Sequence, residues 1–81
     1  MRAQELSVEI RYEIGDPRCK ELIETAQTYE EALRVAAAEA LRRAYVITIY
    51  DRMARRGAAE EYAIAPDGHA AVTRVRAGAS R

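Results

Sequence analysis

The chain opens with a strict alternation of apolar and polar residues. Even positions from Leu6 to Ile14 carry aliphatic or aromatic side chains, and the odd positions between them are polar, with Glu9 and Glu13 among them. A period of two places successive side chains on opposite faces of a strand, one buried and one exposed. We therefore expect a first strand over 6–14, which the Gly-Asp-Pro sequence at 15–17 ends.

The segment 18–27 fits two structures. Asp16 as an N-cap and Pro17 at the first helical position, followed by Cys19, Leu22, Ile23 and Ala26 at helical spacing, would make a short helix. The Gly-Asp-Pro sequence is also turn chemistry, so 20–26 can return as the second arm of a hairpin. We favour the hairpin, because a second short helix would leave the first strand without a local partner.

The next element is a helix that begins after Thr28 and ends near Arg43. The Thr28 hydroxyl can accept a hydrogen bond from a free amide of the first turn, and Glu31 can reach back to the cap. Small and apolar residues then recur at helical spacing, which predicts one stripe packed on a sheet. Val35 and Ala38 fall on the outer side. The stripe consists of Tyr29, Leu33, Ala36, Ala37, Ala40, Leu41 and Ala44.

Three strands are predicted after the helix. Residues 45–50 are β-branched or aromatic on both faces, as expected of the central strand of a sheet. A basic hairpin tip at 52–57 leads to a strand over 61–65, with Tyr62 and Ile64 on one face. A tight Pro-Asp-Gly turn at 66–68 then precedes a last strand around Ala71, Thr73 and Val75.

These elements predict an α+β fold in which a single helix packs on a small, mainly antiparallel sheet, in the order ββαβββ. The length of 81 residues corresponds to a single domain, 1–81, in which we expect 77–81 to be a loose C-terminal tail. Alanine is as common as Leu, Ile, Val and Met together, and Phe and Trp are absent. Since so small a domain buries little surface of its own, we expect a homodimer or docking on a partner.

The charges cancel overall but are unevenly distributed. Thirteen basic and thirteen acidic residues give a net charge of zero, which removes the general charge signal of a nucleic-acid or membrane-binding protein. Residues 1–33 nevertheless carry a net charge of −4, and residues 34–81 carry +4. Such a chain can pair with itself or present two faces of opposite sign.

No motif in the sequence predicts catalysis. Cys19 and His69 are the single cysteine and histidine, and no spacing brings them within hydrogen-bond reach of each other. There is no metal-ligand spacing and no Gly-rich phosphate loop. We therefore expect a protein that is not an enzyme and holds no cofactor or metal. A lone cysteine, without a signal peptide or membrane span, favours a cytoplasmic protein.

An arginine cluster is the best candidate for a functional surface. Arg52, Arg55 and Arg56 lie on the predicted hairpin tip, and Arg42 and Arg43 at the end of the helix could join them. Guanidinium groups pair bidentately with phosphates or carboxylates, so this cluster could contact either. A solvated loop is the simpler interpretation, with Arg42 and Arg43 offsetting the negative end of the helix dipole.

Acidic residues form a second candidate surface on the first hairpin. Glu9 and Glu13 alternate along the first strand, and further glutamates follow to the start of the helix. They could meet a basic partner or take the place of nucleic-acid phosphates. Alternating glutamates also keep an exposed sheet face soluble, which is the simpler interpretation.

Two families resemble this chain. The sequence Glu-Thr-Ala-Gln-Thr-Tyr-Glu-Glu-Ala-Leu at 24–33, after a strand and a Gly-containing turn and before an Ala-rich helix, resembles small antitoxins of the HicB type over 20–41. The aromatic and glycine-containing strand pattern of those antitoxins is absent upstream. The ββαβββ order with the turn at 66–68 is similar in layout to small anti-CRISPR proteins of phages and mobile elements. That resemblance implies an inhibitor that acts by binding.

We therefore expect a small protein-binding domain, one form of which would be an inhibitor of a nucleic-acid-handling complex. The alternative is a nucleic-acid-binding or antitoxin-like regulatory module that uses the arginine-rich tip. Binding to nucleic acid would fall steeply with salt.

Overall fold

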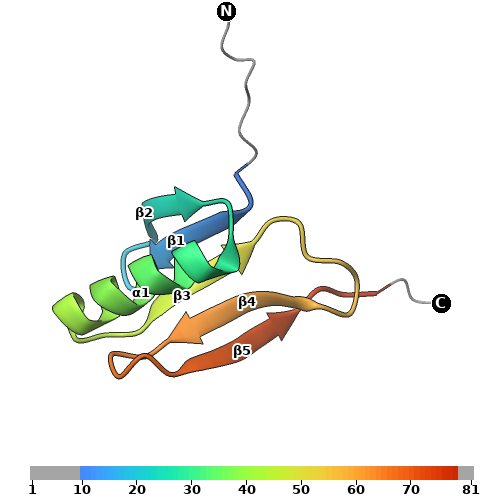
Figure 1. Cartoon of the computed structure of the whole chain (residues 1–81). Coiled ribbons are helices and arrows are strands. Elements are labelled where there is room, and N and C mark those ends of the chain that lie inside the picture. Colours follow the sequence, from blue (N-terminus) through green and yellow to red (C-terminus); the bar gives the residue numbers. More distant parts are fainter. Residues whose placement is uncertain (1–9, 79–81) are drawn as a thin grey trace, which may run out of the picture.

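The computed structural model describes residues 10–78 and confirms the α+β fold. Five antiparallel strands form one sheet in the spatial order β2-β1-β3-β4-β5, and α1 lies across one face of it (Figure 1). Within the described residues, no helix is long and apolar enough to cross a membrane. The elements are β1 (Tyr12–Asp16), β2 (Glu21–Ala26), α1 (Tyr29–Arg43), β3 (Ile47–Asp51), β4 (Ala59–Ile64) and β5 (Ala70–Val75).

The first two strands form the favoured hairpin, and the short helix does not occur. β1 and β2 pair antiparallel, with an irregular register between Ile14 and Gly15. The predicted break at 15–17 was placed too early, because Gly15 and Asp16 continue β1 and Asp16 is buried. The chain turns after Asp16 and enters β2 from Lys20, which has a left-handed φ of 58°. The first part of the expected strand, 6–9, lies outside the described residues.

The predicted helix boundaries are confirmed, but its buried stripe is rotated. Thr28 caps α1, and its hydroxyl accepts a 3.2 Å hydrogen bond from the Glu31 amide. The fully buried helical residues are the alanines at 32, 36 and 40, and not the larger residues of the expected stripe. Leu41 is 69% exposed, whereas Val35 packs against the core. Small alanines let the helix approach the sheet closely, so the larger side chains lie on its flanks.

The last three strands follow the prediction. β3 is the middle strand of the sheet, and Tyr62 and Ile64 of β4 face the helix side opposite Ile49 and Ile47. Gly68 has a φ of 90° in the turn before β5, a conformation that glycine adopts without strain. Of the expected tail, residues 77 and 78 belong to no helix or strand, and 79–81 lie outside the described residues.

The core lies between α1 and the sheet. Its largest fully buried side chains are four isoleucines from β1, β3 and β4, and the ring of Tyr29 in the helix packs at a tilt against that of Tyr62, with ring centroids 4.9 Å apart. α1 packs on β1, β2, β3 and β4 but does not reach β5. Within the described residues, the opposite face of the sheet carries no helix (Figure 1).

Candidate binding surface

The arginines of the described region divide into two kinds. Most of them lie within ion-pair distance of a carboxylate. Within residues 10–78, the exceptions are Arg34, Arg55 and Arg56, all of them exposed. Arg34 lies alone on the outer side of α1, whereas Arg55 and Arg56 are neighbours on the loop between β3 and β4. We call this loop, residues 52–58, the arginine tip.

Arg42 and Arg43 do not join the arginine tip. They end α1 at one end of the sheet, and β3 then runs the length of the sheet before the tip begins (Figure 1). The two predicted parts of the basic cluster are therefore separated by a whole strand. The contacts of Arg42 and Arg43 are also distinct from those of the arginine tip.

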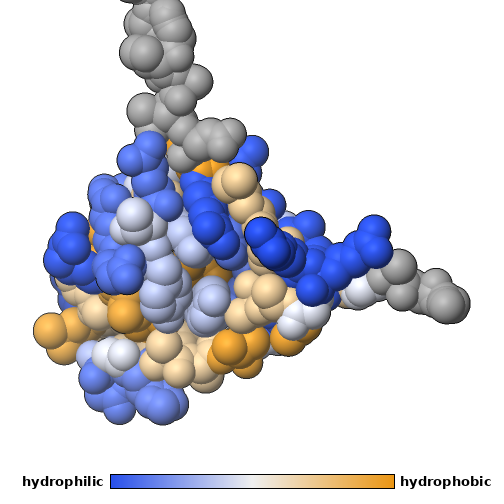
Figure 2. Space-filling view, turned by 45° about the vertical axis from the view of Figure 1, so that its right-hand side comes forward, coloured by the Kyte–Doolittle hydropathy of each residue, from blue (hydrophilic) through white to orange (hydrophobic). Residues whose placement is uncertain are grey.

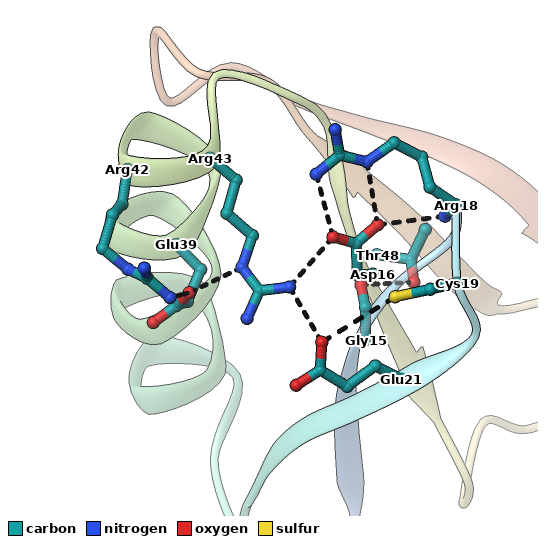
Figure 3. Close-up of polar contacts among 9 residues, drawn as sticks. All are labelled: Gly15, Asp16, Arg18, Cys19, Glu21, Glu39, Arg42, Arg43 and Thr48. Atoms are coloured by element: carbon teal, nitrogen blue, oxygen red, sulfur yellow. Dashed lines mark hydrogen bonds and ion pairs between the residues drawn. The ribbon is translucent and has the colours of Figure 1, made fainter.

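Arg43 belongs to a partly buried ion-pair cluster around the buried carboxylate of Asp16. Its guanidinium donates to Asp16 at 2.9 Å, to Glu21 at 3.1 Å and to Glu39 at 2.9 Å (Figure 3). Arg18 holds the same Asp16 carboxylate through two guanidinium contacts and its own backbone amide. The cluster joins the end of α1 to the hairpin of β1 and β2.

The cluster keeps Asp16 ionised. Hydrogen bonds from the Arg18 side chain and amide, and then from Arg43, hold the pKa of the Asp16 carboxyl well below its ordinary value of 3.8. The same contacts raise the pKa of Arg43 further above its usual range. Because Nε and Nη1 of Arg43 are both engaged by carboxylates of the domain, and its side chain is only 18% exposed, Arg43 acts mainly within the fold. Arg42 pairs with Glu39 at 2.6 Å on the exposed side of the helix.

The arginine tip is held in place at both of its ends. At the start, the Asp51 carboxylate accepts a 2.9 Å hydrogen bond from the Met53 amide, and Ala54 is buried against the domain. At the finish, Gly57 donates to the carbonyl of Arg76 and Ala58 donates to the carbonyl of Arg55, both at 2.9 Å. Gly57 has a φ of 82°, which an alanine would reach only with strain. The tip is therefore a preorganised turn.

Asp51 is fixed by Arg11 beside the tip. The Arg11 guanidinium makes a bidentate contact with the Asp51 carboxylate at 2.9 and 3.0 Å. Burial raises the pKa of Asp51, but the hydrogen bonds from Arg11 and the Met53 amide outweigh it, so the pKa is lowered overall. Asp51 is buried, whereas the Arg11 side chain is 42% exposed, and together they fix the start of the tip.

The tip arginines differ in their contacts. Arg52 lies 3.8 Å from the carboxylate of Glu13 and donates to the carbonyl of Ile10 at 3.3 Å, so it is directed back toward β1. Arg55 and Arg56 form no side-chain hydrogen bond or ion pair with residues 10–78. As far as the described part of the chain goes, their charges are thus left for a partner.

Arg74 of β5 and Arg76, just after it, add two arginines to the same end of the sheet. Arg74 lies over the ring of Tyr50 at 5.9 Å, and Arg76 donates to the Tyr50 hydroxyl at 3.3 Å. Glu60 and Glu61 of β4 pair with these arginines. Figure 2 shows hydrophilic surface gathered toward this end of the molecule, near the described C-terminal residues. Sequence reasoning did not include this group, although arginines at alternate positions on a strand following an arginine-rich hairpin are a signal for it.

The open sheet face holds a shallow groove of about 380 Å³ beside the first hairpin. Its lining is mixed, with aromatic, small, acidic and basic side chains, Lys20 among them. Glu13 lies here, as the acidic surface predicted, together with Glu21 and Glu61; Glu9 is outside the described residues. The remaining lining includes Gly15, Leu22, Thr48 and Tyr50.

The possible nucleophile and base stay apart. Cys19 is exposed in the turn that joins β1 to β2, and His69 lies in the turn that joins β4 to β5, so β3 separates the two hairpins that carry them. Among residues 10–78, no group of His, Cys, Asp and Glu side chains is arranged to hold a metal ion.

Comparison with known proteins gives no further assignment: no family model matches the chain, and no curated protein or solved structure matches it significantly. The functional argument therefore rests on the surfaces described above.

Proposed function

We propose that this protein is a non-catalytic binding domain that docks its arginine tip on an acidic surface of a partner protein. One observation carries the proposal: Arg55 and Arg56 are adjacent, exposed and unpaired among the described residues, on a loop fixed at both ends. Planar guanidinium groups pair bidentately with carboxylates, and a preorganised loop loses little conformational entropy on binding. Arginine is also enriched at the energetic centres of protein interfaces.

A protein partner fits this surface better than a nucleic acid does. Nucleic-acid binding draws its affinity from many phosphate contacts, each of which needs an available cation. At this end of the sheet, the cations other than Arg55 and Arg56 are already paired with Glu13, Asp51, Glu60 or Glu61. These carboxylates would also repel a polyphosphate backbone, whereas a protein surface can present both signs of charge.

A specific form of the proposal is inhibition of a nucleic-acid-handling complex, as the resemblance to anti-CRISPR proteins implies. The groove of the open sheet face presents Glu13 and Glu61 toward the tip, whereas Glu21 lies at the far end of the groove beside Arg43. A basic nucleic-acid-binding surface would meet these carboxylates while the tip contacts an acidic part of the same complex. Co-expression with a CRISPR system that targets a plasmid should then restore transformation by that plasmid.

The central test is charge reversal at the tip. The variant R55E/R56E should lose its partner proteins in affinity capture followed by quantitative mass spectrometry, whereas R34E should keep them. Arg34 is the matched control, because it is also exposed and has no ion-pair partner among residues 10–78, but lies on the outer side of α1. Each captured protein that depends on the tip would be purified and its affinity measured directly. Equal capture by wild type and R55E/R56E would contradict the proposal.

The alternative function, nucleic-acid binding, has its own measurement. Fluorescence anisotropy with labelled duplex and single-stranded DNA should show weak binding with a shallow dependence on salt, since two free arginines make about two phosphate contacts. Tight binding with a steep salt dependence, lost in R55E/R56E, would favour the nucleic-acid module over the protein-binding domain.

A further inference from the structure

The two edges of the sheet are protected to different degrees. The edge strand β2 carries exposed Glu21 and Glu24, begins at a left-handed Lys20, and has an irregular register with β1. Charged side chains and bulges are the features by which edge strands avoid pairing with another chain. A second copy approaching through β2 would bring glutamates toward glutamates.

The opposite edge, β5, lacks this protection over its first half. Residues 70–72 are Ala, Ala and Val, and their register with β4 is regular up to Val72, after which it shifts at Glu61. Val72 is 53% exposed, and α1 does not reach β5. Figure 2 shows apolar surface low on the molecule, at the height of β5 in Figure 1. This segment has neither a charge nor a proline to prevent strand addition.

The backbone of the same segment is directed outward. Ala65 donates to the carbonyl of His69 at the start of the hairpin, and Ala63 lies opposite Ala71 two residues further along. In an antiparallel ladder, hydrogen-bonded and non-bonded pairs alternate, so Ala71 bonds to β4. The amide and carbonyl groups of Ala70 and Val72 therefore point away from β4, toward the open edge, and no strand within residues 10–78 pairs with them.

We propose that β5 pairs antiparallel with β5 of a second copy of this chain, with Ala71 at the two-fold axis. Ala70 of each copy then exchanges backbone hydrogen bonds with Val72 of the other, and the two sheets become one continuous sheet. On the helix side, each valine packs against the small Ala70 of the second copy, so that large meets small.

The register favours a second copy as the occupant of this edge, because Val72 and Ala70 are complementary in size across the two-fold axis and no like charges meet. Antiparallel pairing about Ala71 places Arg74 and Arg76 of the two copies at opposite ends of the joined strands, where they do not oppose each other. The two arginine tips also point in opposite directions and stay accessible. Because the contact consists of backbone hydrogen bonds and apolar side chains, salt should not dissolve it. This inference does not rest on the proposed function.

The first test measures the mass of the protein in solution and asks whether the dimer depends on β5. Size-exclusion chromatography with light scattering should give twice the chain mass of 9.1 kDa at low and at high salt. V72P removes an outward amide of an edge strand and should be a folded monomer by circular dichroism. The controls L22K and L22E alter an equally exposed apolar residue on β2 and should stay dimeric. A monomeric wild type, or monomeric L22K and L22E, would overturn the proposal.

A charge swap tests the register. Ala71 is exposed on the open sheet face and lies beside its symmetry mate, so A71K alone and A71E alone should each be at least tenfold weaker dimers through like-charge repulsion. Mixing the two variants should restore a dimer containing one copy of each, detected by native mass spectrometry. Dimers of A71K as stable as wild type, or a mixture without the mixed dimer, would exclude pairing about Ala71.

Discussion

At the end of the sheet where α1 finishes, Arg43 lies within hydrogen-bond distance of three carboxylates and is only 18% exposed. At the other end, Arg55 and Arg56 are exposed and have no carboxylate partner among residues 10–78. The same residue type therefore has two uses in one small domain. Where elements must be joined across a thin core, arginine acts as a structural cross-link. Where a loop is already fixed by its backbone, arginine is left for binding.

Removal of Arg43 should have the largest effect on stability. R43A would leave the buried Asp16 with one guanidinium fewer and would disconnect α1 from the first hairpin. Breaking a buried pair by removing one partner is strongly destabilising, so the melting temperature should fall by about 5 °C or more. R42A is the control, since Arg42 makes a single exposed pair and should change the melting temperature by less than about 2 °C. Equal effects of the two variants would show that the cluster does not stabilise the fold.

Acid should reduce the stability contribution of Asp16, at the α1 end of the sheet, more than that of Asp51, beside the arginine tip. The folded pKa of Asp16 is lowered, so its contribution is fully present above the ordinary pKa of 3.8 and is lost as pH falls below it. Asp51 behaves in the same direction, but burial opposes the lowering of its pKa. Urea unfolding from about pH 5 downward should therefore show a loss of stability that D16N reduces more than D51N does. A D16N curve parallel to that of wild type would contradict this assignment.

One residue with a left-handed backbone lies at each end of the sheet, and substituting these two residues should change the stability by smaller amounts of opposite sign. Ala44 ends α1 with a φ of 55°, and Gly57 forms the arginine tip with a φ of 82°. Because a side chain strains this conformation, A44G should stabilise the protein by about 0.5–1 kcal/mol and G57A should destabilise it by about 1 kcal/mol. Denaturant unfolding measures both values. Changes of the same sign would mean that packing, and not backbone strain, decides at these positions.

The sequence predicts the caps and turns at the two ends of the sheet, but not the ion pairs that join distant segments. The Thr28 cap, the Pro-Asp-Gly turn and the hairpin tip depend on neighbouring residues, and all three occur where expected. The ion pairs of Arg43 with Asp16 and Glu21 join residues more than 20 positions apart, and no spacing along the chain indicates them. For the same reason Arg42 and Arg43 were grouped with the tip, although β3 separates them.

The helix shows a second limit of sequence reasoning. Hydrophobicity alone favours Leu41 over Ala32 as a buried residue, but close approach of α1 to the sheet requires the smaller side chain. The rotation of the buried stripe therefore depends on the distance between layers, which a helical periodicity does not contain. As a result Leu33 and Val35 occupy the flanks of the helix, and Leu41 is exposed.

Charge reversal at the tip should have the smallest effect on stability and the largest on binding. Arg55 and Arg56 contribute no side-chain contact within residues 10–78, so R55E/R56E should change the melting temperature by less than about 2 °C. Its affinity for an acidic partner should nevertheless fall by at least tenfold, because both attractive charges become repulsive. Differential scanning fluorimetry and calorimetric titration of the captured partner measure the two quantities. A variant that unfolds would place these arginines in the structure, and the contrast between the two ends of the sheet would no longer hold.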